Sequence, residues 1–178
     1  VNLAMLVLRV VVGLLFVGHG AQKLFGWFGG HGPDGTGQYM ESLGLTRGKA
    51  MAILAGMAEV IGGLLFACGL LTPVAAALLS TVMLTAIWTA HRGHGLWVVN
   101  GGYEYPLVML AVAFAVTAAG AGAWSLDDVW NLNVAGEEWA IGQLAAGIIA
   151  AGLTVGASRL AAKRGQRHGH GQAAPAGS

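Results

Sequence analysis

The chain has 178 residues, of which 56% are hydrophobic and only 10% are charged, and its formal net charge is +1. A soluble domain usually carries about 25% charged residues, so this chain has too few charges for a water-exposed surface. Together with a mean hydropathy of +0.67, this composition predicts an integral membrane protein and gives no reason to expect a nucleic-acid partner.

Spanning the hydrocarbon layer as a helix takes about 20 mainly apolar residues. Five segments of the chain meet this requirement, which predicts an all-α integral membrane protein. They are Leu3–Leu24, Ala50–Leu71, Pro73–Ala90, Tyr105–Ala123 and Trp139–Ala157. The residues beyond the last segment, 161–178, form a basic, low-complexity tail that we expect to be disordered.

Two stretches between these segments carry helix-start signals. Thr72 is expected to cap the third segment, and Pro73 suits its first turn, where a missing N–H costs nothing. Ser125 and Asp128 have capping-box spacing, which predicts a short interfacial helix containing Trp130.

Lysine and arginine collect on the cytoplasmic side of membrane proteins. With five spans, all basic loop and tail residues fall on one side: Arg47, Lys49, Arg92, Arg159, Lys163, Arg164 and Arg167. The acidic loop residues fall on the other: Asp127, Asp128, Glu137 and Glu138. We therefore expect the N-terminus outside and the C-terminus in the cytoplasm.

Two charged residues, Arg9 and Glu59, lie inside predicted spans. A charge at the centre of a span costs about 2.5–3.5 kcal/mol, so such charges are usually paired or functional. Arg9 would lie roughly 9 Å from the outer face and Glu59 roughly 13 Å from the inner face. An arginine side chain can bridge most of the remaining gap, so an Arg9–Glu59 pair is feasible, with either a structural or a functional role.

A second polar group gathers where spans meet the inner interface. It comprises His19, Gln22, Lys23, His91, Arg92, His94, Asn100, Tyr103 and Glu104. Histidine and glutamate there could relay protons, and histidine, tyrosine and tryptophan could hold a quinone ring. The alternative is polar anchoring at the membrane surface, where such residues are common.

Three other motifs bear on nucleotide binding, metal binding and helix packing. Gly18-His-Gly20-Ala-Gln-Lys23 lacks the third glycine of a dinucleotide fingerprint and its alternating strands and helices. His91 and His94 alone are a weak metal signal, so no metal site is expected. Gly152 and Gly156 match GxxxG, which permits close packing within the monomer or in a homo-oligomer.

Several motifs resemble the DoxX family of small bacterial membrane proteins, in the right order over about residues 3–128. They are Leu8-Arg9, Gly13-Leu-Leu-Phe16, Gly18-His-Gly20, Lys23, Ala58-Glu59-Val-Ile-Gly62-Gly63, Asn100-Gly101-Gly102-Tyr103-Glu104-Tyr-Pro and Gly120-Ala-Gly122-Ala-Trp124-Ser-Leu-Asp127. The resemblance implies that residues 1–128 form a four-helix transmembrane bundle, located in the bacterial cytoplasmic membrane. Residues 129–160 then add an interfacial segment and a fifth transmembrane helix, which departs from the family pattern.

The resemblance also implies an association with oxidoreductase systems. We therefore expect a membrane subunit of a redox system that handles a quinone or a small sulfur species. The candidate proton-moving residues are His19, Glu59 and Glu104, and the candidate substrate-binding residues are Arg9, Lys23 and Asn100. The alternatives are a non-catalytic scaffold that recruits soluble oxidoreductase partners to the membrane, and a carrier of small solutes or protons.

Overall fold

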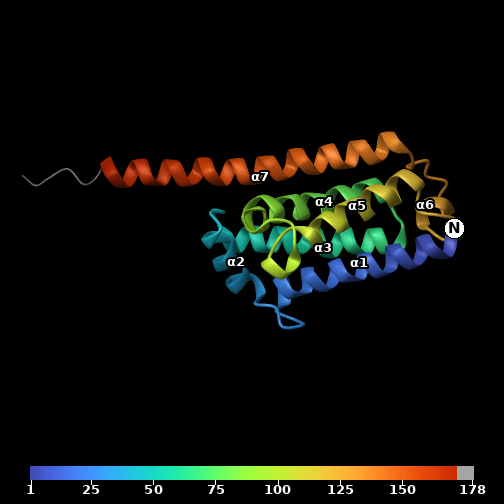
Figure 1. Cartoon of the computed structure of the whole chain (residues 1–178), viewed down its shortest axis with the longest axis horizontal. Coiled ribbons are helices and arrows are strands. Elements are labelled where there is room, and N and C mark those ends of the chain that lie inside the picture. Colours follow the sequence, from blue (N-terminus) through green and yellow to red (C-terminus); the bar gives the residue numbers. More distant parts are fainter. Residues whose placement is uncertain (172–178) are drawn as a thin grey trace, which may run out of the picture.

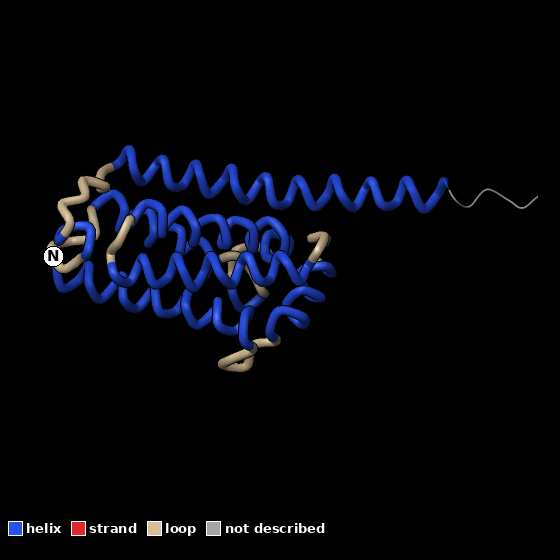
Figure 2. The backbone as a smooth tube through the Cα atoms, turned by 180° about the vertical axis from the view of Figure 1, so that it is seen from behind, coloured by secondary structure: helices blue, strands red, loops and turns tan. Residues whose placement is uncertain are grey.

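The computed structural model describes residues 1–171, with side chains as far as residue 164, and this part of the chain is helical without any strand (Figure 2). The long elements are α1 Asn2–Phe25, α2 Gly32–Ser42, α3 Gly48–Cys68, α4 Thr72–Ala86, α5 Glu104–Ala119 and α7 Glu137–Gly171. The short elements are the π turn η1 Ile87–His91, the 3-10 turns η2 Arg92–His94 and η3 Val98–Asn100, and α6 Leu126–Val129.

Helices α1, α3, α4, α5 and α7 lie side by side along the long axis of the molecule (Figure 1). One end of this bundle holds residue 1, the α3–α4 turn and α6, and is called the N-terminal end. The other holds α2 and the turns η1 to η3, and is called the α2 end. Helix α7 runs past the bundle at the α2 end (Figure 1).

Within the described residues, four helices are long and apolar enough to cross a membrane: Asn2–Phe25, Gly48–Cys68, Thr72–His94 and Glu137–Arg164. The fourth predicted span is shorter than expected, because Gly120 adopts a φ of 87° and α5 ends at Ala119. Its 16 residues still cover about 24 Å. The all-α membrane bundle and the multi-pass arrangement predicted from the sequence are therefore confirmed.

Glycines bring α1 and α3 into backbone contact. A Cβ atom on Gly13 would collide with the Gly63 carbonyl, and one on Gly20 would lie 2.6 Å from the carbonyl oxygen of Gly56. Small residues are the usual means of close helix approach in membranes, where no hydrophobic effect drives helices together. This contact fixes which residues of α1 and α3 face each other along their whole length.

Helix α7 packs against α4 and α5 as an integral part of the bundle. Its face toward α4 includes the buried Ala140 and Ala151, and the buried Ser80 hydroxyl donates to Oε1 of Gln143 at 3.0 Å. Gly156 faces open space, so it makes no close packing contact within the described chain, and a homo-oligomer through GxxxG stays a prediction. The helix continues to Gly171, inside the predicted disordered tail, and residues 172–178 lie outside the described residues.

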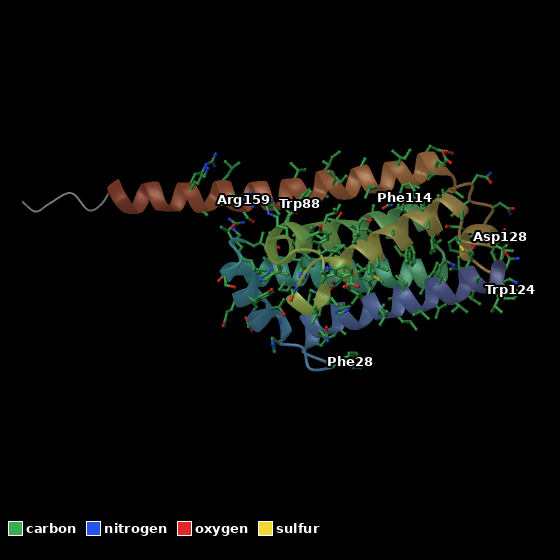
Figure 3. All side chains as sticks on the ribbon, in the orientation of Figure 1. Phe28, Trp88, Phe114, Trp124, Asp128 and Arg159 are labelled. Atoms are coloured by element: carbon green, nitrogen blue, oxygen red, sulfur yellow. The ribbon has the colours of Figure 1, made fainter. Side chains whose placement is uncertain are left out.

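The two ends of the bundle differ in the charge of their residues, and both ends carry tryptophans. Figure 3 shows Trp88 and Arg159 toward the α2 end, and Trp124 and Asp128 at the N-terminal end. This separation matches the grouping expected from the sequence. Which end faces the cytoplasm stays a prediction.

Asp127 joins separate segments at the N-terminal end. It caps α4 in place of Thr72, the residue expected from the sequence. Helix α4 begins at Thr72, and its cap is the buried Asp127 carboxylate, which accepts from the N–H groups of Leu71 at 2.6 Å and Thr72 at 3.0 Å. The Thr72 hydroxyl donates to the same carboxylate. The Asp127 N–H donates to the Gly69 carbonyl at 2.8 Å, so α6 is joined to the α3–α4 turn by both the backbone and the side chain of Asp127.

The predicted capping box is present in part. The Ser125 hydroxyl accepts from the Asp128 N–H at 3.2 Å, and the resulting helix α6 ends at Val129, with Trp130 as its C-cap rather than within it.

Replacing Asp127 by alanine removes a helix cap and leaves buried N–H groups without an acceptor. We expect D127A to lower the free energy of unfolding by about 2 kcal/mol, measured by SDS titration of the purified protein. D128A is the matched control, because this neighbouring carboxylate is exposed, and a change within about 0.5 kcal/mol is expected. Equal losses in both variants would refute the capping role of Asp127.

Candidate functional site: a cavity with a buried ion pair

An ion pair with a buried carboxylate joins the last turn of α1 to α3, and the Lys23 side chain is 21% exposed. The Lys23 ammonium lies 2.9 Å from Oε1 and 2.7 Å from Oε2 of Glu59, and Glu59 is only 1% exposed. Only the contact with Oε1 has hydrogen-bond geometry, so Oε2 accepts no hydrogen bond from the described residues. Lys23 is thus the one hydrogen-bond partner of this carboxylate among the described residues, and the carboxylate keeps lone pairs that accept no hydrogen bond.

The Arg9–Glu59 pair that the sequence allowed is not formed. Arg9 is fully buried, but its guanidinium turns toward the N-terminal end and donates to the carbonyls of Trp124 at 2.8 Å and Ala67 at 3.3 Å. The helix register explains this difference. Gly13 faces Gly63 and Gly20 faces Gly56 across the α1–α3 contact. Arg9 therefore lies level with Ala67 and not with Glu59, whereas the side chain of Lys23 reaches back along α1 to the Glu59 carboxylate.

A chain of hydrogen bonds extends from α1 to α5 beside this pair. His19 Nδ1 lies 3.1 Å from Oε1 of Gln22, and His19 Nε2 lies 3.3 Å from the hydroxyl of Tyr105. The His19 and Tyr105 rings are 5.9 Å apart and tilted by 59°. Gln22 in turn donates through Nε2 to the Phe28 carbonyl at 3.2 Å, which anchors the chain to the loop after α1.

These groups face a cavity of about 510 Å³. Its walls are mostly apolar, and its polar lining includes His19, Lys23, Thr36, Glu59, Thr81, Thr85, Thr89, His91 and Tyr105. The volume falls within the range of typical ligand pockets, and an apolar wall with a few convergent polar groups is the usual form of a binding site.

Helix α2 and its C-cap residue form the wall of the cavity at the α2 end of the bundle. The residues that line it there include Tyr39, Met40 and Leu43. Helix α2 is held on α3 by a contact of Gly37 with Gly48, too close for any side chain on Gly48. Glu41, one turn from Gly37 along α2, accepts from the Gly48 N–H at 2.9 Å and so caps α3.

Helix α4, together with the π turn η1 that continues it and contains Thr89, contributes a row of hydroxyls at every fourth position. The hydroxyls of Thr81, Thr85 and Thr89 donate to the carbonyl four residues earlier, at 2.7, 2.8 and 2.8 Å. The helix then widens into the π turn η1, a distortion found frequently at functional sites.

The structure divides the predicted site residues into three places. His19, Lys23 and Glu59 line the cavity together, and Arg9 lies at the N-terminal end. Glu104 lies outside the cavity lining and accepts from the Val98 N–H at 2.9 Å, where it stabilises the loop before α5. Asn100 is exposed in that same loop. Of the other polar interface residues, only His91 lines the cavity.

Sequence reasoning missed Tyr105 and the threonine row. Tyr105 opens the fourth apolar segment and reads as an interfacial anchor, although it follows Glu104 directly. The threonine spacing of four residues in a segment free of charge was the available signal for a polar helix face. Among the described residues, no group of three histidine, cysteine, aspartate or glutamate side chains lies close enough to hold a metal ion.

Comparisons with known proteins agree with the motifs quoted above. The sequence model of the DoxX family matches residues 4–92, from α1 into the turns after α4. A Bacillus subtilis protein named "Putative oxidoreductase CatD" is 31% identical over 114 residues, covering 64% of this chain and 78% of that protein. The Escherichia coli inner membrane protein YphA is 34% identical over 131 residues, covering 69% and 87%.

A third relative, the uncharacterized membrane protein Rv3486 of Mycobacterium tuberculosis, is 31% identical over 132 residues, covering 67% of this chain and 77% of that protein. No solved structure matches the chain.

The ion pair can be tested by a double-mutant cycle. K23M leaves the Glu59 carboxylate buried without a cation, so we expect it to lower the free energy of unfolding by about 3 kcal/mol. Adding E59Q to K23M should recover at least about 1 kcal/mol relative to the sum of the single changes. SDS titration of the purified variants measures both values.

The matched cycle combines R9M with E59Q. Because Arg9 does not contact Glu59, these two changes should add to within about 0.5 kcal/mol. A coupling for Arg9–Glu59 as large as that for Lys23–Glu59 would contradict the assigned pairing.

Proposed function

The chain belongs to the DoxX family of membrane proteins, and from this premise we propose that it is a membrane subunit of a redox system that binds a quinone. The observation that carries the proposal is the cavity of about 510 Å³, whose apolar walls end at Lys23, Glu59, His19 and Tyr105. The name of the Bacillus subtilis relative, which describes that protein as an oxidoreductase, supports the same class of function.

The lining fits the chemistry of a quinone. Met51, Leu54 and Val82 are among the apolar wall residues that suit an isoprenoid tail. The polar groups gather where α1, α3 and α5 meet, within reach of ring oxygens. A bound quinone supplies the capacity to take up two electrons and two protons. His19, Glu59 and Tyr105 can hold or exchange the protons, and Lys23 supplies the counter-charge of the Glu59 carboxylate.

The charge balance favours a quinone over a small sulfur anion. Lys23 is the one lysine or arginine among the described lining residues, and Glu59 already neutralises it. An anion in this cavity would therefore lie beside a carboxylate without a second cation. Arg9, the other candidate for binding an anion, uses its guanidinium on backbone carbonyls at the N-terminal end.

Quinone binding can be measured by titrating the purified protein with a decyl-substituted benzoquinone and following intrinsic tryptophan fluorescence. We expect saturable binding, and we expect A55F to weaken it at least about tenfold, because Ala55 lines the cavity and a phenyl ring would occupy ligand volume.

A145F is the matched control, because Ala145 lies exposed on α7 and not on the cavity wall. It should bind as the unchanged protein does. If the unchanged protein shows no saturable binding, or if both variants bind equally well, the proposed function is wrong.

The length of α7 supports a second candidate, a scaffold that recruits soluble oxidoreductase partners. A helix of 35 residues is about 52 Å long, well beyond the hydrocarbon thickness of about 30 Å. The C-terminal part of α7 projects past the bundle (Figure 1), and the last third of this helix carries the exposed Arg159 and Lys163. The projecting part is not required to form the cavity, and it offers a docking surface for a soluble partner.

Complementation of a host strain that lacks the gene separates the two candidates. If quinone binding is the function, E59Q should abolish tolerance of redox stress, and removal of residues 161–178 should leave it intact. The scaffold predicts the reverse. Growth under an imposed oxidant measures the difference, with membrane abundance of each variant checked by immunoblot.

A further inference from the structure

The amide orientation of Gln22 fixes the hydrogen bonds of the cavity. Its Nε2 faces the Phe28 carbonyl, which can only accept, so the amide oxygen must face His19 Nδ1. An amide oxygen can also only accept. His19 Nδ1 therefore carries a proton, and in the neutral ring Nε2 is left with a lone pair.

This tautomer directs the Tyr105 hydroxyl. Because His19 Nε2 accepts, the Tyr105 hydroxyl donates its one proton to the imidazole. The lone pairs of the Tyr105 oxygen are then what remains for a molecule in the cavity. Gln22, which touches no ligand position itself, acts as a positioning residue for this arrangement.

His91 and the threonines present acceptors for the same reason. His91 Nδ1 lies 2.7 Å from the Gly101 carbonyl, so it is the protonated nitrogen and Nε2 of the neutral ring is an acceptor. Thr81, Thr85 and Thr89 give their hydroxyl protons to backbone carbonyls, which leaves only oxygen lone pairs. Thr154, which also lines the cavity, does the same toward Ala150.

The buried Glu59 carboxylate, whose described partner is the Lys23 ammonium alone, adds an anionic acceptor with lone pairs left for a further donor. The donors are few by comparison. Lys23 directs its ammonium at Glu59 and at the His19 carbonyl, 3.5 Å away. Thr36 and Tyr39, both on α2, make no side-chain hydrogen bond within the described chain and can donate or accept.

We propose that the cavity selects a head group that donates hydrogen bonds, so that it binds the dihydroxy form of a quinone–quinol couple in preference to the quinone. The quinone itself carries two carbonyl acceptors and no donor, so it leaves Glu59 Oε2 unsatisfied. Its hydroquinone can donate one hydroxyl to Glu59 and direct the other toward Tyr105 or the threonine row. This inference rests on the proposed function and names the redox form that the same cavity takes.

The preference has a redox consequence. A protein that binds the reduced form of a couple more tightly raises the midpoint potential of the bound couple. Each tenfold preference corresponds to about 30 mV for a two-electron couple. The cavity would therefore make its bound quinone a better electron acceptor than the same quinone in the surrounding lipid.

The test uses three probes with the same decyl tail, titrated anaerobically against the purified full-length protein. They are a benzoquinone, its hydroquinone, and the hydroquinone dimethyl ether, which keeps the oxygen atoms but has no donor. We expect the hydroquinone to bind at least about tenfold more tightly than the other two, because it alone satisfies a buried charged acceptor.

The outcomes distinguish a failure of the hydroquinone preference from a failure of quinone binding itself. If the quinone or the ether binds as tightly as the hydroquinone, the inference fails while the proposed function stands. If none of the three binds, the proposed function fails with it. These comparisons use the unchanged protein, so they do not depend on any variant folding.

A variant assigns the preference to Glu59. In E59Q the carboxylate is replaced by a neutral amide that brings a donor of its own, so the hydroquinone preference should fall at least about fivefold. The matched control is E137Q, which makes the same change at an exposed position at the other end of the bundle and should keep the preference. An unchanged preference in folded E59Q would overturn the role of Glu59.

Discussion

The burial of one carboxylate, Glu59, is the constraint on which the rest of the structure depends. A charge in the low-dielectric interior of a membrane bundle is tolerated only when a counter-charge and hydrogen bonds offset its lost hydration. Lys23 supplies the charge because Gly20 and Gly56 let α1 and α3 touch. The glycines of these helices are therefore as much a part of the site as the charged residues.

The two ends of the bundle differ in how their buried polar groups obtain hydrogen-bond partners. At the N-terminal end, Arg9 and Asp127 form hydrogen bonds with backbone groups of separate segments. Toward the α2 end, the helices diverge around a cavity whose polar groups retain unused capacity, as Oε2 of Glu59 does. The molecule joins its segments at one end and presents binding chemistry near the other.

Hydropathy was enough to predict the helical membrane fold, because segment length and apolar content follow directly from bilayer thickness. The cost of buried charge was enough to select Arg9 and Glu59, and the polar grouping at the inner interface included Lys23. Neither argument could identify the partner of Glu59, because depth along a helix says nothing about rotation around it. Tyr105 was missed because its partner, His19, lies 86 positions away in the chain, and no local pattern encodes that contact.

The cap of α4 also imposes an order on the making of the protein. The N–H groups of Leu71 and Thr72 obtain their acceptor from Asp127, which the ribosome adds 56 and 55 positions later. The α3–α4 hairpin must therefore wait, with its turn incomplete, until α5 has been inserted and carries Asp127 back to the same membrane face. A fragment ending at residue 92, the limit of the family match, would contain every residue of that hairpin and still lack the carboxylate that finishes it.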